Sequence, residues 1–191
     1  MRLHEIIEKN YPEYYGWFEY PSDGTVAFNK TDGEWGILGN FARAPIVVDG
    51  VTFDCAEKLF QVMKFTDPEV RRDVYSTKGM PIKWRAKHHE KEGARRPDWG
   101  RIIVDALKFC LVNKYAQSEA FRRELSRTGD RHIVEAAHGR ADTYSASLSA
   151  DGTTWSGGNL MGRLLMELRD TGKLEYHLPE DAMRFRDLLG P

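Results

Sequence analysis

Apolar residues recur every three or four positions over much of the chain after residue 54, and this spacing is typical of amphipathic helices. The longest run, residues 98–117, is apolar on so many positions that we expect a mostly buried helix. A second strong pattern begins near Gly158 and ends by Gly172. Shorter helices are expected at about 55–65, from Pro68 onward, and at 81–91, 118–127 and 180–189.

The chain before residue 54 mixes turns with short β-type runs. Residues 25–30 form one candidate strand, and residues 45–53 form a candidate hairpin with Asp49-Gly50 as its turn. Further along, residues 132–135 are expected to form a short strand, and the Gly/Ser/Thr-rich residues 138–156 are expected to form a loop. The pattern therefore predicts a mainly α protein with a small β element, in the α+β class.

The amino-acid composition indicates the class of protein to which the chain belongs. The chain has 191 residues, of which 41% are hydrophobic and 30% charged, as in ordinary soluble globular proteins. It has no apolar run long enough to span a membrane, and its charged opening residues lack the apolar core of a secretory signal. The two cysteines, Cys55 and Cys110, give neither a disulfide framework nor a metal-ligand spacing. We expect a cytoplasmic protein with no membrane association and no bound metal.

The charge is unevenly spread along the chain. The net charge is −1, but residues 70–101 contain ten Lys or Arg and only four Asp or Glu. Such a segment can receive an anionic ligand without making the whole protein bind polyanions. The alternative is that this segment is simply a solvated helical face.

One predicted helix carries a polar row. Asp54 followed by Glu57 predicts a capping box at its start. The spacing of Glu57, Phe60, Gln61 and Lys64 then places a carboxylate, a ring, an amide and an ammonium on one helix face. Such a row suits a polar ligand, and a carboxylate and a lysine can exchange protons or act as nucleophiles. The alternative is an exposed Glu–Lys face on an amphipathic helix.

Five sequence blocks in order resemble the NADAR (YbiA-like) family. That family typically has a Leu-Ser-Asn-Phe element, then Glu-x-x-Phe-Gln-x-x-Lys-Phe, and later a closing Asn-x-Leu-Gly-x-x-Leu-Met-x-x-Arg helix. The matching blocks here are Leu38-Gly39-Asn40-Phe41, then 57–65, Arg96-Pro97-Asp98-Trp99, then 111–115 with Thr128-Gly129-Asp130 and Val134-Glu135, and finally Asn159 to Arg169. The resemblance implies a compact YbiA-like domain at 28–172, with an N-terminal extension at 1–27 and a helical tail at 173–191.

The resemblance also implies an activity. Known members are N-glycosidases that cleave a bond between a ribose carbon and a nitrogen, without a cofactor. One branch hydrolyses phosphoribosylamino-pyrimidine intermediates of riboflavin synthesis, and another removes ADP-ribose from guanine bases in nucleotides or nucleic acid. The expected partner is therefore a nucleotide or an ADP-ribosylated guanine, possibly within a nucleic acid.

The catalytic residues implied by this resemblance are Glu57, Lys64 and Glu135. Glycoside cleavage develops positive charge on the anomeric carbon, which a neighbouring carboxylate stabilises or attacks through an activated water. We assign this role to Glu57, with Glu135 as a second candidate. Lys64 either forms a Schiff base with the opened sugar or binds phosphate.

The expected substrate-binding residues come from the same blocks. Aromatic rings would stack on a base or ribose, and side-chain amides would orient hydroxyls or a phosphate. Arg95, Arg96 or another basic residue of segment 70–101, together with the backbone amides near Gly158, would meet phosphates. The phenylalanine and tryptophan rings have the alternative of lying in the core. The full set is Asn40, Phe41, Phe60, Gln61, Arg96, Asp98, Trp99, Gly158 and Asn159.

Two positions depart from the family pattern. The serine of Leu-Ser-Asn-Phe is Gly39 here, and the Trp-Gly pair that family members carry after the Val-Glu strand is missing from residues 138–156. Tyr144 or Trp155 would take its place in a base pocket. Two other functions stay open: a non-catalytic sensor of ADP-ribose or an NAD-derived nucleotide, and a nucleic-acid interaction module that uses residues 70–101.

Overall fold

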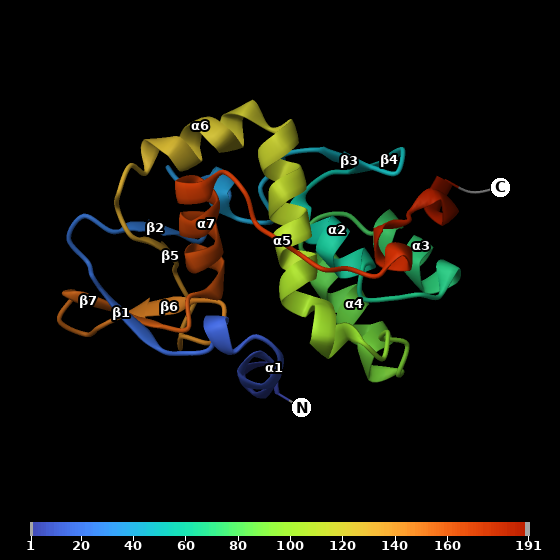
Figure 1. Ribbon diagram of the computed structural model, residues 1–191, viewed down its shortest axis with the longest axis horizontal. Helices are drawn as coiled ribbons and strands as arrows, with labels where there is room; N and C mark the ends of the chain where they lie inside the picture. The colour runs from blue at the N-terminus through green and yellow to red at the C-terminus, as the bar shows by residue number, and fades with distance from the viewer. Residues whose placement is uncertain (1, 190–191) are drawn as a thin grey trace. The chain divides into compact units, whose positions relative to one another are not determined.

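A computed structural model describes residues 2–189 of the chain (Figure 1). It consists mainly of helices with three small sheets, which confirms the predicted α+β class. The chain divides into two compact units, each assembled from two separate stretches. Residues up to 39 and 120–174 form the first unit, and residues 40–119 with those from 175 onward form the second.

The first unit contains five short strands. β1 (Phe18–Pro21), β7 (Thr154–Gly157) and β6 (Ala146–Leu148) form an antiparallel sheet in that order. β2 (Val26–Phe28) pairs in parallel with β5 (Ile133–Glu135). The strands at 26–28 and 133–135 confirm two predictions, whereas β6 and β7 lie where a loop was predicted. That prediction was wrong because β7 pairs with β1, over a hundred residues earlier, and β6 pairs with β7 in the same sheet. Local sequence does not reveal the pairing with β1.

Helices cover the strands of the first unit. α7 (Leu160–Thr171) packs on β5, and it ends at Gly172 as predicted. The close approach requires Gly162, since a Cβ atom there would lie 2.1 Å from the carbonyl oxygen of Ile133. The remaining helical elements of this unit are α1 (Leu3–Asn10), η1 (Pro12–Tyr14), η2 (Gly36–Leu38) and α6 (Glu119–Arg127).

The second unit is built around α5 (Trp99–Gln117), most of whose residues are buried, as the sequence predicted. α2 (Ala56–Val62) packs against it, and α3 (Pro68–Ser76) and α4 (Pro81–Lys91) pack on α2 and on each other. The hairpin of β3 (Ile46–Val48) and β4 (Val51–Phe53) has its predicted turn at Asp49, which adopts a positive φ of 50°. Two 3-10 helices, η3 (Glu180–Met183) and η4 (Arg186–Leu189), replace the single helix predicted there.

The starts of two helices were predicted from neighbouring residues, and only one of the two predictions is confirmed. Asp67 accepts hydrogen bonds from two backbone amides at the start of α3, with Pro68 in the first turn, as predicted. The capping box predicted at Asp54 is absent, because Cys55 is the N-cap of α2 and Asp54 instead pairs with Lys58 at 2.9 Å.

Within residues 2–189, none of the helices combines the length and the apolar character needed to cross a bilayer.

Candidate active site

Glu57 lies in the first turn of α2, in the second unit. Every residue of this short helix is buried, and the Glu57 side chain is only 6% exposed. The backbone amide of Glu57 donates to the carbonyl oxygen of Asn40 at 2.9 Å, so the Asn40-Phe41 segment is fixed at the start of the helix. The predicted polar helix is therefore a core element rather than an exposed amphipathic face.

Two side chains hold one oxygen of the Glu57 carboxylate. Gln61 Nε2 donates to Oε1 at 2.7 Å, and Lys83 Nζ lies 3.6 Å from the same atom. Lys83 also lies 4.9 Å from the ring centroid of Phe41. In the described residues Oε2 carries no hydrogen bond, so it is the oxygen able to meet a substrate or water.

Two buried acceptors lie in the same part of the unit. Asn40 Oδ1 and Gln61 Oε1 have no hydrogen-bond partner among the described residues. A buried polar atom without a hydrogen-bond partner costs about 1–3 kcal/mol. A hydrogen bond from a bound group would remove this cost. Both atoms would accept a hydrogen bond from a hydroxyl or an N–H group.

Lys64 lies beyond the end of the helix on which it was predicted. α2 ends at Val62, so Lys64 lies in the following turn. Its ammonium pairs with Glu90 of α4 at 2.7 Å, not with Glu57. The ammonium also lies 5.8 Å from the ring centroid of Phe60, and Phe60 contacts Trp99 edge-on at 5.3 Å.

Lys83 and Glu90 are the two residues that sequence reasoning missed. Both lie in the basic segment 70–101, where Lys83 was one cation among ten and Glu90 one of four acids. No local signal distinguished them, because their partners come from α2 and the turn after it.

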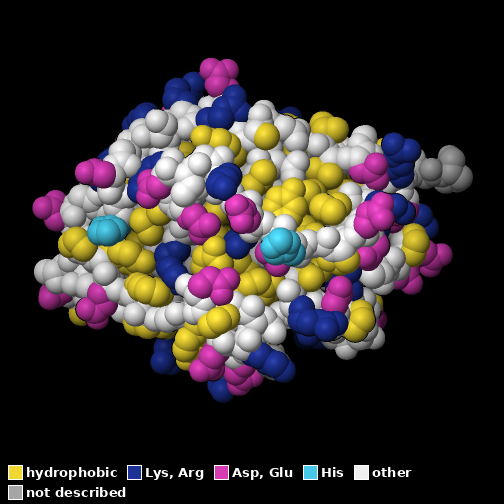
Figure 2. All heavy atoms as spheres, in the orientation of Figure 1, with side chains coloured by type: hydrophobic (Ala, Val, Ile, Leu, Met, Phe, Trp, Pro, Cys, Tyr) yellow, Lys and Arg dark blue, Asp and Glu magenta, His cyan; other side chains and the backbone are white. Residues whose placement is uncertain are grey.

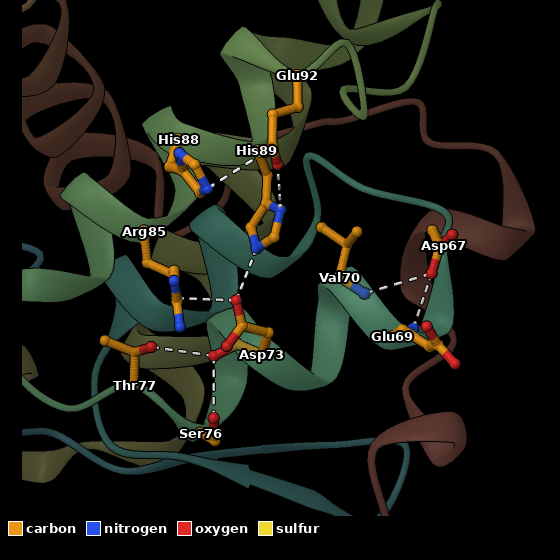
Figure 3. Close-up of polar contacts among 10 residues, drawn as sticks. All are labelled: Asp67, Glu69, Val70, Asp73, Ser76, Thr77, Arg85, His88, His89 and Glu92. Carbon is orange, nitrogen blue, oxygen red and sulfur yellow. Dashed lines mark hydrogen bonds and ion pairs between the residues drawn. The ribbon is translucent and has the colours of Figure 1, made fainter.

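α4, which carries both residues, is fixed to α3 by a network around Asp73 (Figure 3). Asp73 Oδ2 pairs with Arg85 Nε at 2.8 Å and with His89 Nε2 at 2.6 Å, and both partners belong to α4. Figure 3 also shows His88 and His89 turned toward Glu92. These contacts set the position from which Lys83 and Glu90 extend.

Arg96 was expected to meet a phosphate. Instead its guanidinium is buried and forms a two-point contact with Asp98, at 2.6 and 3.0 Å, and a third contact with Asp181 at 3.1 Å. The hydrogen bond from Arg96 lowers the pKa of the Asp98 carboxyl. Arg96 and Asp98 therefore act as a structural pair at the start of α5, and Trp99, 2% exposed, lies in the core.

The other predicted residues belong to the first unit. Asn159 is fully buried in a left-handed conformation, with φ of 45°. Its side chain donates to the carbonyl oxygen of Ile133 at 2.9 Å and accepts from the backbone amide of Glu135 at 3.2 Å. Asn159 therefore fixes the end of β5 and the position of Glu135 through both the nitrogen and the oxygen of its side-chain amide.

Gly158 was expected to offer amides to an anion. The first amides of α7 are already bound: Gly158 donates to Asp142 at 3.0 Å and Leu160 to Thr143 at 3.0 Å. The structure therefore does not support an anion site there. Tyr144 is half-buried in the preceding loop, and Trp155 packs from β7 against a small apolar cluster that includes Tyr20.

Two further features of residues 2–189 concern metal ions and pockets. No group of three or more His, Cys, Asp or Glu residues is placed to hold a metal ion. A pocket of about 510 Å³ in the second unit contains none of the predicted site residues, and three aspartates balance three arginines along its wall. It is lined by Asp49, Pro68, Arg71, Asp181, Arg184, Arg186 and Asp187.

Comparison with known proteins gives one consistent family. Residues 27–171 match the NADAR domain. The N-glycosidase YbiA of Escherichia coli (strain K12) is 30% identical over 153 residues, which cover 80% of this chain and 91% of that protein. A riboflavin biosynthesis protein of Vibrio vulnificus is 28% identical over 162 residues. The match covers 85% of this chain but only 42% of the length of that protein. The NMR structure of E. coli YbiA superimposes with a TM-score of 0.63 and 28% identity, over 82% of this chain and 90% of that one.

Proposed function

Because the chain belongs to the NADAR domain family, we propose that it is an N-glycosidase that hydrolyses the bond between a ribose carbon and a nitrogen. The observation that carries this proposal is the buried Glu57 carboxylate, held at one oxygen by Gln61 and Lys83. The names of the relatives, N-glycosidase and riboflavin biosynthesis protein, are compatible with this class of reaction.

The carboxylate suits this chemistry for an electrostatic reason. Cleavage develops positive charge on the anomeric carbon, and a fixed anion in a water-poor site stabilises that charge or deprotonates the attacking water. Gln61 and Lys83 both contact Oε1, so they orient the carboxylate. In the proposed complex Oε2 would face the reacting carbon. Glu135 of the first unit stays the second candidate for this role.

Substrate recognition follows from the neighbouring groups. The acceptors Asn40 Oδ1 and Gln61 Oε1 would bind ribose hydroxyls or N–H groups of a base. Lys83, which lies over the ring of Phe41, would attract a phosphate. The candidate substrates are ADP-ribosylated guanine and a phosphoribosylamino-pyrimidine.

Lys64 enters this proposal as a cation. Its ion pair with Glu90 would have to break before the amine could attack an opened sugar, so we favour electrostatic binding over a Schiff base.

The test compares the wild type with Glu57→Gln on both substrates. The variant keeps an oxygen for Gln61 but loses the negative charge, so turnover should fall by about 10²–10⁴. Ligand affinity, measured by calorimetry with ADP-ribose, should change little. The matched control is Glu69→Gln, which removes an exposed carboxylate in the same unit and should keep the wild-type rate.

Two outcomes would overturn the proposal. One is unchanged turnover by Glu57→Gln. The other is a wild type that binds ADP-ribose but releases no product from either substrate at high enzyme concentration, which would favour the sensor function instead.

A further inference from the structure

The pocket between α3 and the C-terminal segment of the second unit is lined by residues that the proposed reaction does not use. Its volume of about 510 Å³ is within the range of small-molecule sites. Pro68 and Arg71 of α3 line it together with four residues of the segment 181–187. That segment follows residues 27–171, which match the NADAR domain, and Glu57 does not line the pocket. We therefore ask what this pocket could bind.

Arg71 carries the most buried charge of the pocket wall. The residue is only 7% exposed. Its Nη1 atom pairs with Asp187 Oδ1 at 3.1 Å, and its Nη2 atom donates to the carbonyl oxygen of Arg184 at 2.5 Å. The remaining N–H group, at Nε, has no hydrogen-bond partner among residues 2–189. An unpaired buried donor is costly, so an acceptor on a bound molecule would stabilise it.

Asp187 offers the opposite chemistry beside Arg71. Its Oδ1 atom contacts the guanidinium, whereas its buried Oδ2 atom has no hydrogen-bond partner in the part of the chain that the structure describes. The unpaired nitrogen and the unpaired oxygen belong to two groups that already touch, so covalent geometry keeps both atoms within the span of one small molecule. A carboxylate would accept from Arg71 Nε, and an ammonium would donate to Asp187 Oδ2.

The charge of the wall favours a ligand that carries both signs. Three arginines and three aspartates line the pocket, so the wall has no net charge to attract a polyanion. The exposed side chains of Arg184 and Arg186 are paired with Glu180 and Asp49, respectively. Basic and acidic side chains are likewise interspersed over the face of the molecule in Figure 2. A phosphate would therefore meet as much repulsion as attraction at this wall.

We propose that this pocket binds a free α-amino acid, with its carboxylate at Arg71 and its ammonium at Asp187. An α-amino acid carries these two groups on one carbon atom, which suits the closeness of the two unpaired atoms. The rest of the pocket, beside Pro68, would take the side chain. Because the ligand contacts both α3 and the segment 181–187, its binding should stabilise the folded protein. The inference is independent of the proposed glycosidase function.

The first experiment uses the wild type and needs no catalysis. Thermal unfolding is measured with each of the twenty common amino acids, and we expect at least one to raise the unfolding temperature in a concentration-dependent way. Calorimetry then compares that amino acid with its N-acetyl derivative and its α-carboxamide, each of which lacks one of the two charges. Each derivative should bind about 10–100 times more weakly. An excess of inorganic phosphate should not displace the amino acid.

The second experiment places the binding in this pocket. Asp187→Asn keeps an oxygen but loses the charge that would meet the ammonium, so we expect the affinity for the amino acid to fall about tenfold. The matched control is Asp32→Asn, which changes an exposed aspartate of the first unit and should bind as the wild type does. Unfolding of the ligand-free variants shows whether each is folded. If Asp187→Asn does not fold, the comparison of the two derivatives on the wild type still decides the question.

Four results would overturn this inference. They are no binding of any amino acid, derivatives that bind as tightly as the parent amino acid, a folded Asp187→Asn variant with unchanged affinity, and displacement of the amino acid by phosphate. The last result would indicate an anion site instead. None of these measurements depends on turnover, so failure of the amino-acid site and failure of the glycosidase function are distinguishable.

Discussion

Glu57 makes one contact that its spacing in the sequence predicts and one contact that the spacing does not predict. Its spacing from Gln61 is one helical turn, so their contact at 2.7 Å follows from local geometry alone. Its contact with Lys83, at 3.6 Å, joins α2 to α4 and has no counterpart in the local pattern. The same limit applies to Lys64, whose partner is Glu90 rather than Glu57.

Burial of Lys114 should make the stability of the protein depend on pH. It lies fully buried in α5, and this burial lowers its pKa from an ordinary value of 10.5 to about 7. The folded protein therefore binds fewer protons than the unfolded chain between these two values, so this residue's contribution to stability rises with pH over that range.

We accordingly expect Lys114→Met, whose side chain carries no charge at any pH, to be most favourable relative to the wild type at neutral pH, where the folded wild type still holds a buried ammonium in part. The advantage should shrink at about pH 9.5, where the folded wild type holds a neutral amine. Urea unfolding of both proteins at the two pH values measures the difference. A difference that does not depend on pH would contradict a role for the charge.

Neighbouring residues were enough to predict some elements of this fold but not others. The Asp67-Pro68 start of α3 and the Asp49-Gly50 turn were predictable, because a cap and a tight turn are decided by neighbouring residues. The sheet β1-β7-β6 was not, because its strands are only three or four residues long and come from opposite ends of the chain.

The close packing of α7 on β5 should make the stability of the protein sensitive to substitution of Gly162. Gly162→Ala would place a Cβ atom 2.1 Å from the Ile133 carbonyl oxygen, a backbone atom that cannot rotate away. We expect a loss of about 1–3 kcal/mol in the free energy of unfolding as the helix moves off the strand. Gly139→Ala is the control, because its Cβ would meet no atom within 4 Å. Denaturant unfolding of both variants compares the costs, and equal stability would show that the close approach is unimportant.

At the scale of the molecule, neither compact unit is a continuous stretch of chain. The second unit is completed by residues beyond 174, which lie on α3 and the β3–β4 hairpin. Phe185 is fully buried there, with its ring 5.1 Å from that of Phe53. Arg71, also buried, pairs with Asp187 at 3.1 Å and donates to the carbonyl oxygen of Arg184 at 2.5 Å.

Truncation after Leu174 should therefore destabilise the protein by about 4 kcal/mol or more, since it opens a cavity at Phe53 and leaves Arg71 and Arg96 without acidic partners from the C-terminal segment. Thermal unfolding of the shortened chain measures the loss. The control Arg186→Ala removes a side chain that is 83% exposed and should cost less than about 1 kcal/mol. A truncated protein as stable as the wild type would show that the segment is dispensable.

The sequence alone determined the helical periods, the hairpin, the family and the placement of Glu57 and Gln61 one turn apart on a helix, because each depends on residue types at short, fixed spacings. The tertiary structure decided which groups meet. It paired Lys83 with Glu57 and Glu90 with Lys64, and it assigned Arg96 and Asn159 to structural hydrogen bonds. Apart from the local pair of Arg96 with Asp98, these contacts join segments far apart in the chain, and their geometry is set by the packing of whole helices, which no local pattern encodes.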